Sequence, residues 1–184
     1  MTSPTRPTRP TRLNLTALAQ AGAPLAGQAI LAELPRLAAD VPDPTLATAP
    51  VSYRATAEWR ANAGADRQLW LHLQAQAEVP LSCQRCLAPA VQAIEVDQWF
   101  RFVATEAEAE AQDDDAEEDL LVLEPQFDLL ALLEDELLMA FPLVPMHEQC
   151  PSPPSFQAGE AELPPEDAKP HPFAALAQLK KKGH

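Results

Sequence analysis

The strongest constraint on the fold of this chain is a pair of long segments in which apolar and polar residues alternate. In residues 51–62, and again in residues 69–79, an apolar side chain recurs at nearly every second position. A period of two is typical of β-strands with one buried face and one solvent-facing side. The glycine-containing residues 63–66 between them predict a hairpin turn. A third alternating run, residues 91–103, predicts another strand of the same antiparallel sheet.

A helix is predicted over residues 128–140. Asp128 can cap its first turn, and Leu130, Leu133 and Leu137 can face the sheet. Because this is the longest helical pattern after the strands, we expect it to be the main helix that covers the sheet.

The other predicted elements are short. A strand is expected at residues 13–17, another at residues 121–123, and a helix interrupted near Pro35 at residues 28–39. Together, the patterns predict an α+β domain over residues 13–150. Its expected architecture is an antiparallel sheet of about four to six strands, covered by one main helix, with flexible N- and C-terminal ends.

Charge is distributed unevenly along the chain. The formal net charge is −14, yet residues 13–168 contain 6 cations and all 27 acids, a net charge of −21. Phosphate binding requires cationic side chains, so any contact with nucleic acid is predicted at the two ends. The cations there are Arg6, Arg9, Arg12, Lys169, Lys180, Lys181 and Lys182.

Both ends are predicted to lie outside the folded domain. Residues 1–12 repeat proline, threonine and arginine without a set of apolar side chains to bury, which predicts a disordered basic arm. Residues 151–184 are predicted as a linker and a basic C-terminal helix, on which Phe173, Leu176 and Leu179 are candidate contacts to a partner.

Acidic side chains form two groups within the domain. Residues 106–119 hold nine acids and no cation, so self-repulsion predicts an open, solvated loop. Glu134, Asp135 and Glu136 are consecutive on the predicted helix, point in different directions and cannot converge on one substrate. We expect them to form a solvated face or a partner contact. The sequence contains no glycine-rich phosphate loop and no nucleophile elbow, so no enzymatic activity is predicted.

Four candidate metal ligands fall into two short motifs. Cys83 and Cys86 form a Cys-x-x-Cys pair between two predicted strands, and His147 and Cys150 follow the prolines that end the predicted helix. One structural Zn²⁺ could take these four soft ligands if the two motifs meet. The alternative is a surface turn and a free thiol. Thiol-disulfide chemistry is a weaker hypothesis, because a helix would have to begin at the pair.

The cysteine content and the hydropathy pattern also bear on location. Three cysteines, an odd number, favour a reducing compartment over a disulfide scaffold. No run approaches the roughly 18 consecutive apolar residues of a membrane span. We therefore expect a cytoplasmic protein without a membrane partner.

Three dissimilar motifs follow one another along the sequence: LSCQRCL at residues 81–87, residues 127–147, which contain EDEL and end in PLVPMH, and KPHPFAAL at residues 169–176. Together they resemble the YceD-type large ribosomal RNA subunit accumulation proteins. The resemblance implies a role in the synthesis, processing or stability of the large-subunit (23S) ribosomal RNA, without an established enzymatic activity. Some relatives carry further cysteines where this chain has His147 and Cys150.

Two functions are therefore expected from the sequence. In the first, the chain is a non-catalytic factor in ribosome biogenesis that binds large-subunit ribosomal RNA or precursor ribosomal particles through its basic ends. In the alternative, its acidic domain is a protein-interaction adaptor that holds a basic ribosomal protein without direct contact with RNA.

Overall fold

The computed structural model describes residues 12–61 and 67–151, which all belong to the unit that ends at Pro153. Arg12 is described and exposed. The basic arm before it, the turn at residues 62–66 and the predicted C-terminal helix lie outside the described residues. The same holds for Arg6, Arg9, Lys169, Phe173, Leu176, Leu179, Lys180, Lys181 and Lys182.

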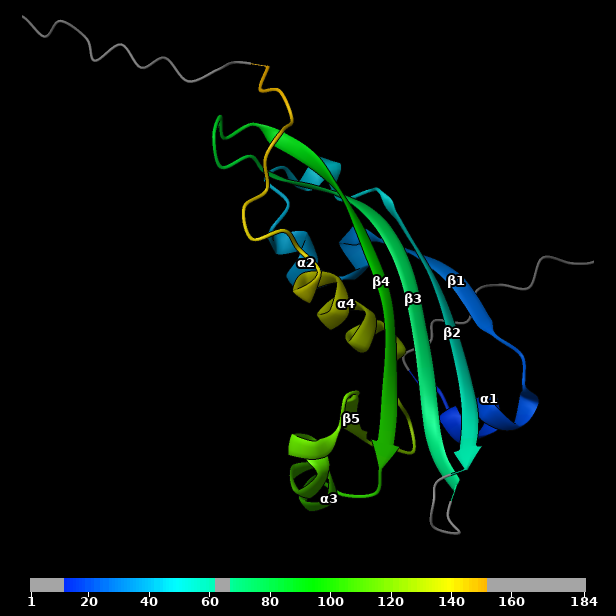
Figure 1. Ribbon diagram of the computed structural model, residues 1–184. Helices are drawn as coiled ribbons and strands as arrows, with labels where there is room; N and C mark the ends of the chain where they lie inside the picture. The colour runs from blue at the N-terminus through cyan, green and yellow to red at the C-terminus, as the bar shows by residue number, and fades with distance from the viewer. Residues whose placement is uncertain (1–11, 62–66, 152–184) are drawn as a thin grey trace, which may run out of the picture. The chain divides into compact units, whose positions relative to one another are not determined.

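Five strands form one sheet in the order β1-β2-β3-β4-β5 (Figure 1). Their bounds are Leu25–Ile30, Pro50–Ala61, Arg67–Ser82, Pro89–Val103 and Asp119–Val122. The first four strands pair antiparallel, as the alternating patterns predict. β5 instead runs parallel to β4, which corrects the expectation of a purely antiparallel sheet. Residues 104–118 return the chain from the end of β4 to the level of Phe100, and β5 then runs beside β4 in the same direction.

One face of the sheet carries the buried apolar side chains and is covered by helices (Figure 1). α1 (Leu15–Ala21) contacts β2, α4 (Leu129–Met139) contacts β3 and β4, and α2 (Pro35–Ala39) packs on α4. Leu133 and Leu137 of α4 are fully buried, as predicted, whereas Leu130 is only half-buried. The domain is therefore α+β, with three helices on the face for which one main helix was expected. Among the described residues, no helix combines the length and apolar character needed to cross a membrane.

The N-terminal predictions are wrong in part. The expected strand at residues 13–17 is instead the start of α1, because the Asn14 side chain accepts a hydrogen bond from the Ala17 N–H at 2.9 Å. Within the expected helix at residues 28–39, the first residues belong to β1. Pro35 begins α2 instead of interrupting a helix, since the N–H that proline lacks has no intrahelical partner at that position.

The acidic segment is ordered, which corrects the expected open loop. α3 (Glu106–Gln112) is followed by the 3₁₀-helix η3 (Asp113–Asp115). The Thr105 side chain caps α3, and acids in the first turn are favoured by the helix dipole. Arg101 on β4 is buried; its guanidinium donates to the Gln112 side chain at 2.6 Å and pairs with Glu118. This buried cation compensates charge within the segment and ties it to the sheet edge.

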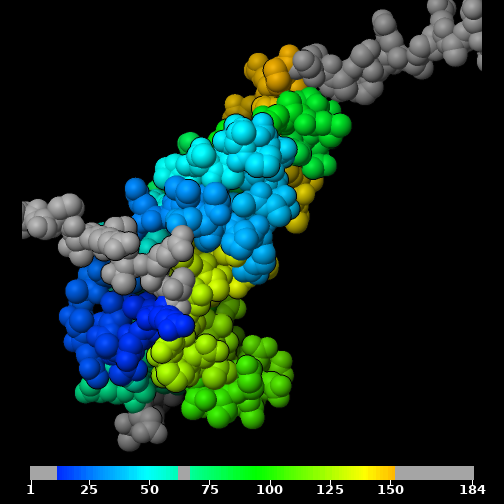
Figure 2. Space-filling view, turned by 180° about the vertical axis from the view of Figure 1, so that it is seen from behind, coloured from blue at the N-terminus to red at the C-terminus, as the bar shows by residue number. Residues whose placement is uncertain are grey.

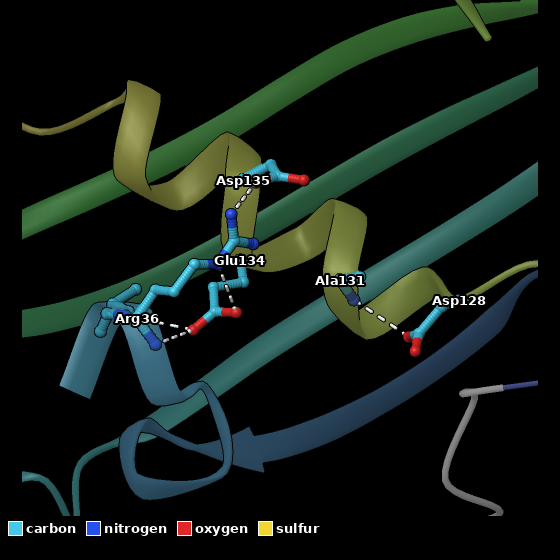
Figure 3. A network of polar contacts seen from close by, with 6 residues as sticks. Arg36, Asp128, Ala131, Glu134 and Asp135 are labelled. Carbon is cyan, nitrogen blue, oxygen red and sulfur yellow. Dashed lines mark hydrogen bonds and ion pairs between the residues drawn. The ribbon is translucent and has the colours of Figure 1, made fainter. Parts of the chain in front are cut away.

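The N-terminus of α2 is capped by a side chain far away in the sequence (Figure 3). The N-cap residue Leu34 has no side-chain hydrogen bond to offer. Instead, the Glu134 carboxylate of α4 accepts the backbone N–H of Arg36 at 2.6 Å and of Leu37 at 3.1 Å. The Arg36 guanidinium donates to Glu134 at 3.1 Å and to Asp135 at 2.5 Å. These contacts join the N-terminal third of the domain to α4.

The expectation of a solvated carboxylate face is therefore wrong for Glu134, whose exposed fraction is 5%. Asp135 is half exposed. Glu136 lies between these extremes, and partial burial together with the charges of Asp119 and Asp135 raises the pKa of its carboxyl. The strongly buried acid of the three, Glu134, has a structural role, because its charge must be matched by donors.

We predict that Glu134→Ala lowers the free energy of unfolding by about 2 to 4 kcal/mol, because it leaves the backbone N–H groups of Arg36 and Leu37 without their acceptor. The matched control is Asp135→Ala, which removes a neighbouring but exposed carboxylate and should cost less than about 1 kcal/mol. Urea unfolding of the two variants and the parent chain measures both changes. Equal destabilisation by the two substitutions would contradict the capping role.

Candidate metal centre

The turn between β3 and β4 carries two of the three thiols. The Cys83 N–H donates to the Ala88 carbonyl at 3.0 Å, and the Leu87 N–H donates to the Cys83 carbonyl at 2.8 Å. Leu87 has a φ of 62°, which places a non-glycine residue in the left-handed region. These bonds close the turn tightly and keep Cys83 and Cys86 together at the end of the β3–β4 pair.

The segment that follows α4 lies beside this turn in both overall views (Figures 1 and 2). Pro142 and Pro145 prevent the helix from continuing. The Gln84 N–H of the turn donates to the Pro145 carbonyl at 2.9 Å, and the Gln92 side chain donates to the Met146 carbonyl at 3.3 Å. The segment of residues 141–151, called the C-terminal loop below, is thereby held against the turn.

The four predicted ligands come together where the loop meets the turn. Their ligand atoms all lie within 4.8 Å of one another, although 61 residues separate Cys86 from His147. The Sγ atoms of Cys83 and Cys150 are 3.8 Å apart, and Cys86 Sγ is 3.4 Å from His147 Nδ1. Cys83 is buried, the other three residues are half-buried, and all three thiols are free. This Cys₃His cluster is close enough to hold one metal ion.

The electrostatics of the cluster distinguish its first two thiols. Burial raises the pKa of Cys83, but hydrogen bonds from the backbone of His147, Arg85 and Cys86 lower it to about 5. The pKa of Cys86 is raised: the Ala88 N–H lowers it, but burial and the neighbouring thiols of Cys150 and Cys83 outweigh that bond. One thiolate therefore forms readily, and a second is resisted unless a cation compensates its charge.

Arg85, in the middle of the Cys-x-x-Cys motif, reaches across to the loop. Its Nε lies 3.0 Å from Cys150 Sγ, and its Nη2 donates to the His147 carbonyl at 2.8 Å. Sequence reasoning assigned Arg85 no role. The available signal was a cation between two candidate thiolates in a domain that contains few cations.

The context of the Cys-x-x-Cys pair does not match a redox motif. β3 ends at Ser82, directly before Cys83, and β4 begins at Pro89. No helix starts in the turn between these strands, whereas the activated thiol of a redox pair lies at a helix N-terminus. The structure therefore gives no support to thiol-disulfide exchange.

The sequence that forms this cluster matches the model of a known protein family. The family model described as large ribosomal RNA subunit accumulation protein YceD matches residues 71–180. The chain belongs to the YceD family. The match runs from β3 beyond the C-terminal loop and includes all four residues of the Cys₃His cluster. The description of the YceD family names accumulation of an RNA subunit and no chemical reaction.

A relative in the YceD family gives a second comparison. The chain is 39% identical over 116 residues to the large ribosomal RNA subunit accumulation protein YceD of Haemophilus influenzae. The alignment covers 58% of this chain and 63% of that relative, so the chain spans less than two thirds of its length. No solved structure matches the chain.

We predict that Leu87→Gly raises the free energy of unfolding by about 0.5 to 1 kcal/mol, because glycine adopts the left-handed conformation without strain. The Leu87 side chain is 77% exposed, so its removal loses little packing. The comparison variant is Leu87→Val, in which the β-branched side chain should lower stability by about 1 kcal/mol. Urea unfolding at fixed metal content measures both, and a less stable glycine variant would contradict the strained turn.

Proposed function

We propose that this member of the YceD family is a non-catalytic factor in ribosome biogenesis that binds large-subunit (23S) ribosomal RNA or precursor ribosomal particles through its basic ends. The names of the family and of the Haemophilus relative support involvement in the accumulation of that RNA. The observation that carries the mode of binding is the charge of the described domain.

The described residues contain 22 acidic and 7 cationic side chains. Four of these seven arginines already contact groups of the protein itself: Arg36 and Arg101 contact carboxylates, Arg60 contacts Glu58, and Arg85 contacts the metal-ligand cluster. A phosphate would have to displace these contacts and approach an acidic surface. The cations at the two ends are therefore the better candidates for contact with RNA.

The helix-free face of the sheet offers little for stacking with RNA bases. Exposed aromatic side chains on a sheet are a common base-binding surface. Here the Arg60 guanidinium lies over the Trp70 and Trp99 rings, at 4.4 and 3.8 Å from their centroids. His72 stacks on Trp99 and pairs with Asp97 at 2.5 Å. The rings are thus covered by the protein's own side chains, and a carboxylate lies beside them.

We predict that binding to single-stranded RNA depends steeply on salt. If about five cations of the ends contact phosphates, the logarithm of the affinity should fall with the logarithm of the salt concentration with a slope of about −3.5. A chain without residues 1–12 and 169–184 should lose this binding. The control is the full chain with Arg54→Ala and Arg67→Ala, which removes two exposed cations of the domain and should bind normally. Fluorescence anisotropy measures each affinity, and unchanged binding after removal of the ends would contradict the proposal.

The cellular role has its own test. Deleting the gene should lower large-subunit relative to small-subunit ribosomal RNA, and expression of the full chain should restore the ratio. Quantitative electrophoresis of total RNA measures it. An unchanged ratio in the deletion strain would count against any role in large-subunit RNA accumulation, whatever the protein binds.

A second candidate function is an adaptor that holds a basic ribosomal protein and does not touch RNA. The excess of acids supports it, as do the exposed apolar side chains of the turn, β4 and the C-terminal loop, the kind of surface that marks protein contacts. These are Leu87, Val91, Leu143, Val144 and Met146. Capture of partners with and without nuclease separates the two functions, because only the adaptor keeps its partner after complete digestion of RNA.

We also propose that the Cys₃His cluster binds one metal ion, as the two sequence motifs predict. The mutual distances of the four ligand atoms support this. Elemental analysis of protein purified without added metal tests it, and a metal content far below stoichiometric would contradict it.

A further inference from the structure

We infer that the Cys₃His cluster is a closed, tetrahedral Zn²⁺ site whose ion fixes the C-terminal loop on the β3–β4 turn. This inference rests on the metal binding proposed above. It adds the identity of the ion, the atom through which the histidine binds, the part played by Arg85 and the consequence for the loop.

Two distances between ligand atoms of the cluster match a tetrahedron around zinc. With Zn–S bonds of about 2.3 Å and a Zn–N bond of about 2.0 Å, two sulfurs lie about 3.8 Å apart and a sulfur and a nitrogen about 3.5 Å. The structure has 3.8 Å between the Cys83 and Cys150 sulfurs and 3.4 Å between Cys86 Sγ and His147 Nδ1. A disulfide would need about 2.05 Å. The sulfurs of Cys83 and Cys150 are therefore spaced as two ligands of one ion.

The histidine is oriented to bind through Nδ1. The other ring nitrogen of His147, Nε2, lies 2.9 Å from the Pro89 carbonyl oxygen. A carbonyl oxygen only accepts, so Nε2 carries the hydrogen and the lone pair of Nδ1 points toward the thiols. A backbone carbonyl that fixes the tautomer of a histidine is the usual partner behind a metal ligand.

The surroundings of the cluster compensate the charge of a zinc-thiolate centre. Three thiolates and one Zn²⁺ leave a single net negative charge. The Arg85 guanidinium lies 3.0 Å from Cys150 Sγ and supplies a positive one. Around Cys83, backbone hydrogen bonds come from His147, Arg85 and Cys86. Arg85 is therefore a positioning residue, because it touches the cluster and the loop without being a ligand.

The type and number of the ligands indicate which ion binds and that its role is structural. Three thiolates and one imidazole suit zinc, whereas Ca²⁺ and Mg²⁺ require oxygen ligands. Four protein ligands fill the tetrahedral positions and leave none for water, which is the arrangement of structural zinc sites. The inferred ion therefore holds two parts of the chain together.

The part that depends on the ion is the C-terminal loop. Its residues form no helix or strand, and apart from the four ligands, the described residues of the turn and β4 that hydrogen-bond to it are Gln84, Arg85, Gln92 and Pro89. β3 and β4 remain paired up to Ser82 and Pro89 without any contribution from the loop. Loss of the ion should therefore release the loop and the turn locally and leave the sheet intact.

Hydrogen exchange of the full chain, before and after removal of zinc by a chelator, tests the inference. Exchange should become about tenfold faster or more in peptides covering residues 83–88 and 141–151. Peptides from β2 should keep their rates and serve as the internal control. His147→Ala should be purified without zinc and show the fast rates from the start, whereas His147→Cys should keep the ion. The matched control His72→Gln alters a histidine outside the cluster and should keep zinc.

The outcomes separate two kinds of failure. Absence of any stoichiometric metal would overturn the proposed metal binding and this inference together. Stoichiometric zinc whose removal leaves the exchange of the loop unchanged would overturn only the inferred role of the ion. A different metal at the cluster, or zinc retained by His147→Ala, would overturn the inferred identity or ligand set.

Discussion

The antiparallel pairing of β3 with β4 is the interaction on which the rest of the domain depends. It runs from the pair Leu69 and Phe102 to the pair Ser82 and Pro89. Because side chains alternate across paired strands, this register places one apolar face beneath the helices. The same register ends directly at the turn that carries Cys83 and Cys86. The core and the candidate metal centre are therefore positioned by one set of backbone hydrogen bonds.

Two buried charged side chains join segments of the domain that strand pairing does not connect. Glu134 caps α2 from α4, and Arg101 on β4 ties the acidic segment to the sheet edge through Gln112 and Glu118. The charge of each side chain is matched by hydrogen-bond donors or acceptors around it. Because acids outnumber cations in the domain, arginines that contact the protein's own carboxylates leave fewer cations free to contact RNA. Fold and proposed function are linked through this distribution of charge.

The elements predicted correctly from the sequence are those whose signal is local. The alternation in β2, β3 and β4 and the N-cap at Asp128 belong to this group, because burial of one face and capping are decided by nearby residues. The parallel direction of β5, the ordering of α3 and the burial of Glu134 depend on partners distant in sequence. The four candidate ligands could be named from their chemistry, but only the fold shows that they meet. Arg85 was missed because its contacts cross to the loop.

The tetrahedral zinc site inferred where the β3–β4 turn meets the C-terminal loop can be tested directly by X-ray absorption spectroscopy at the zinc edge of the full chain, which distinguishes the ligands by element and distance. We expect a first shell of three sulfurs at about 2.3 Å and one nitrogen at about 2.0 Å. A first shell of oxygen and nitrogen alone, or one with fewer than three sulfurs, would contradict it.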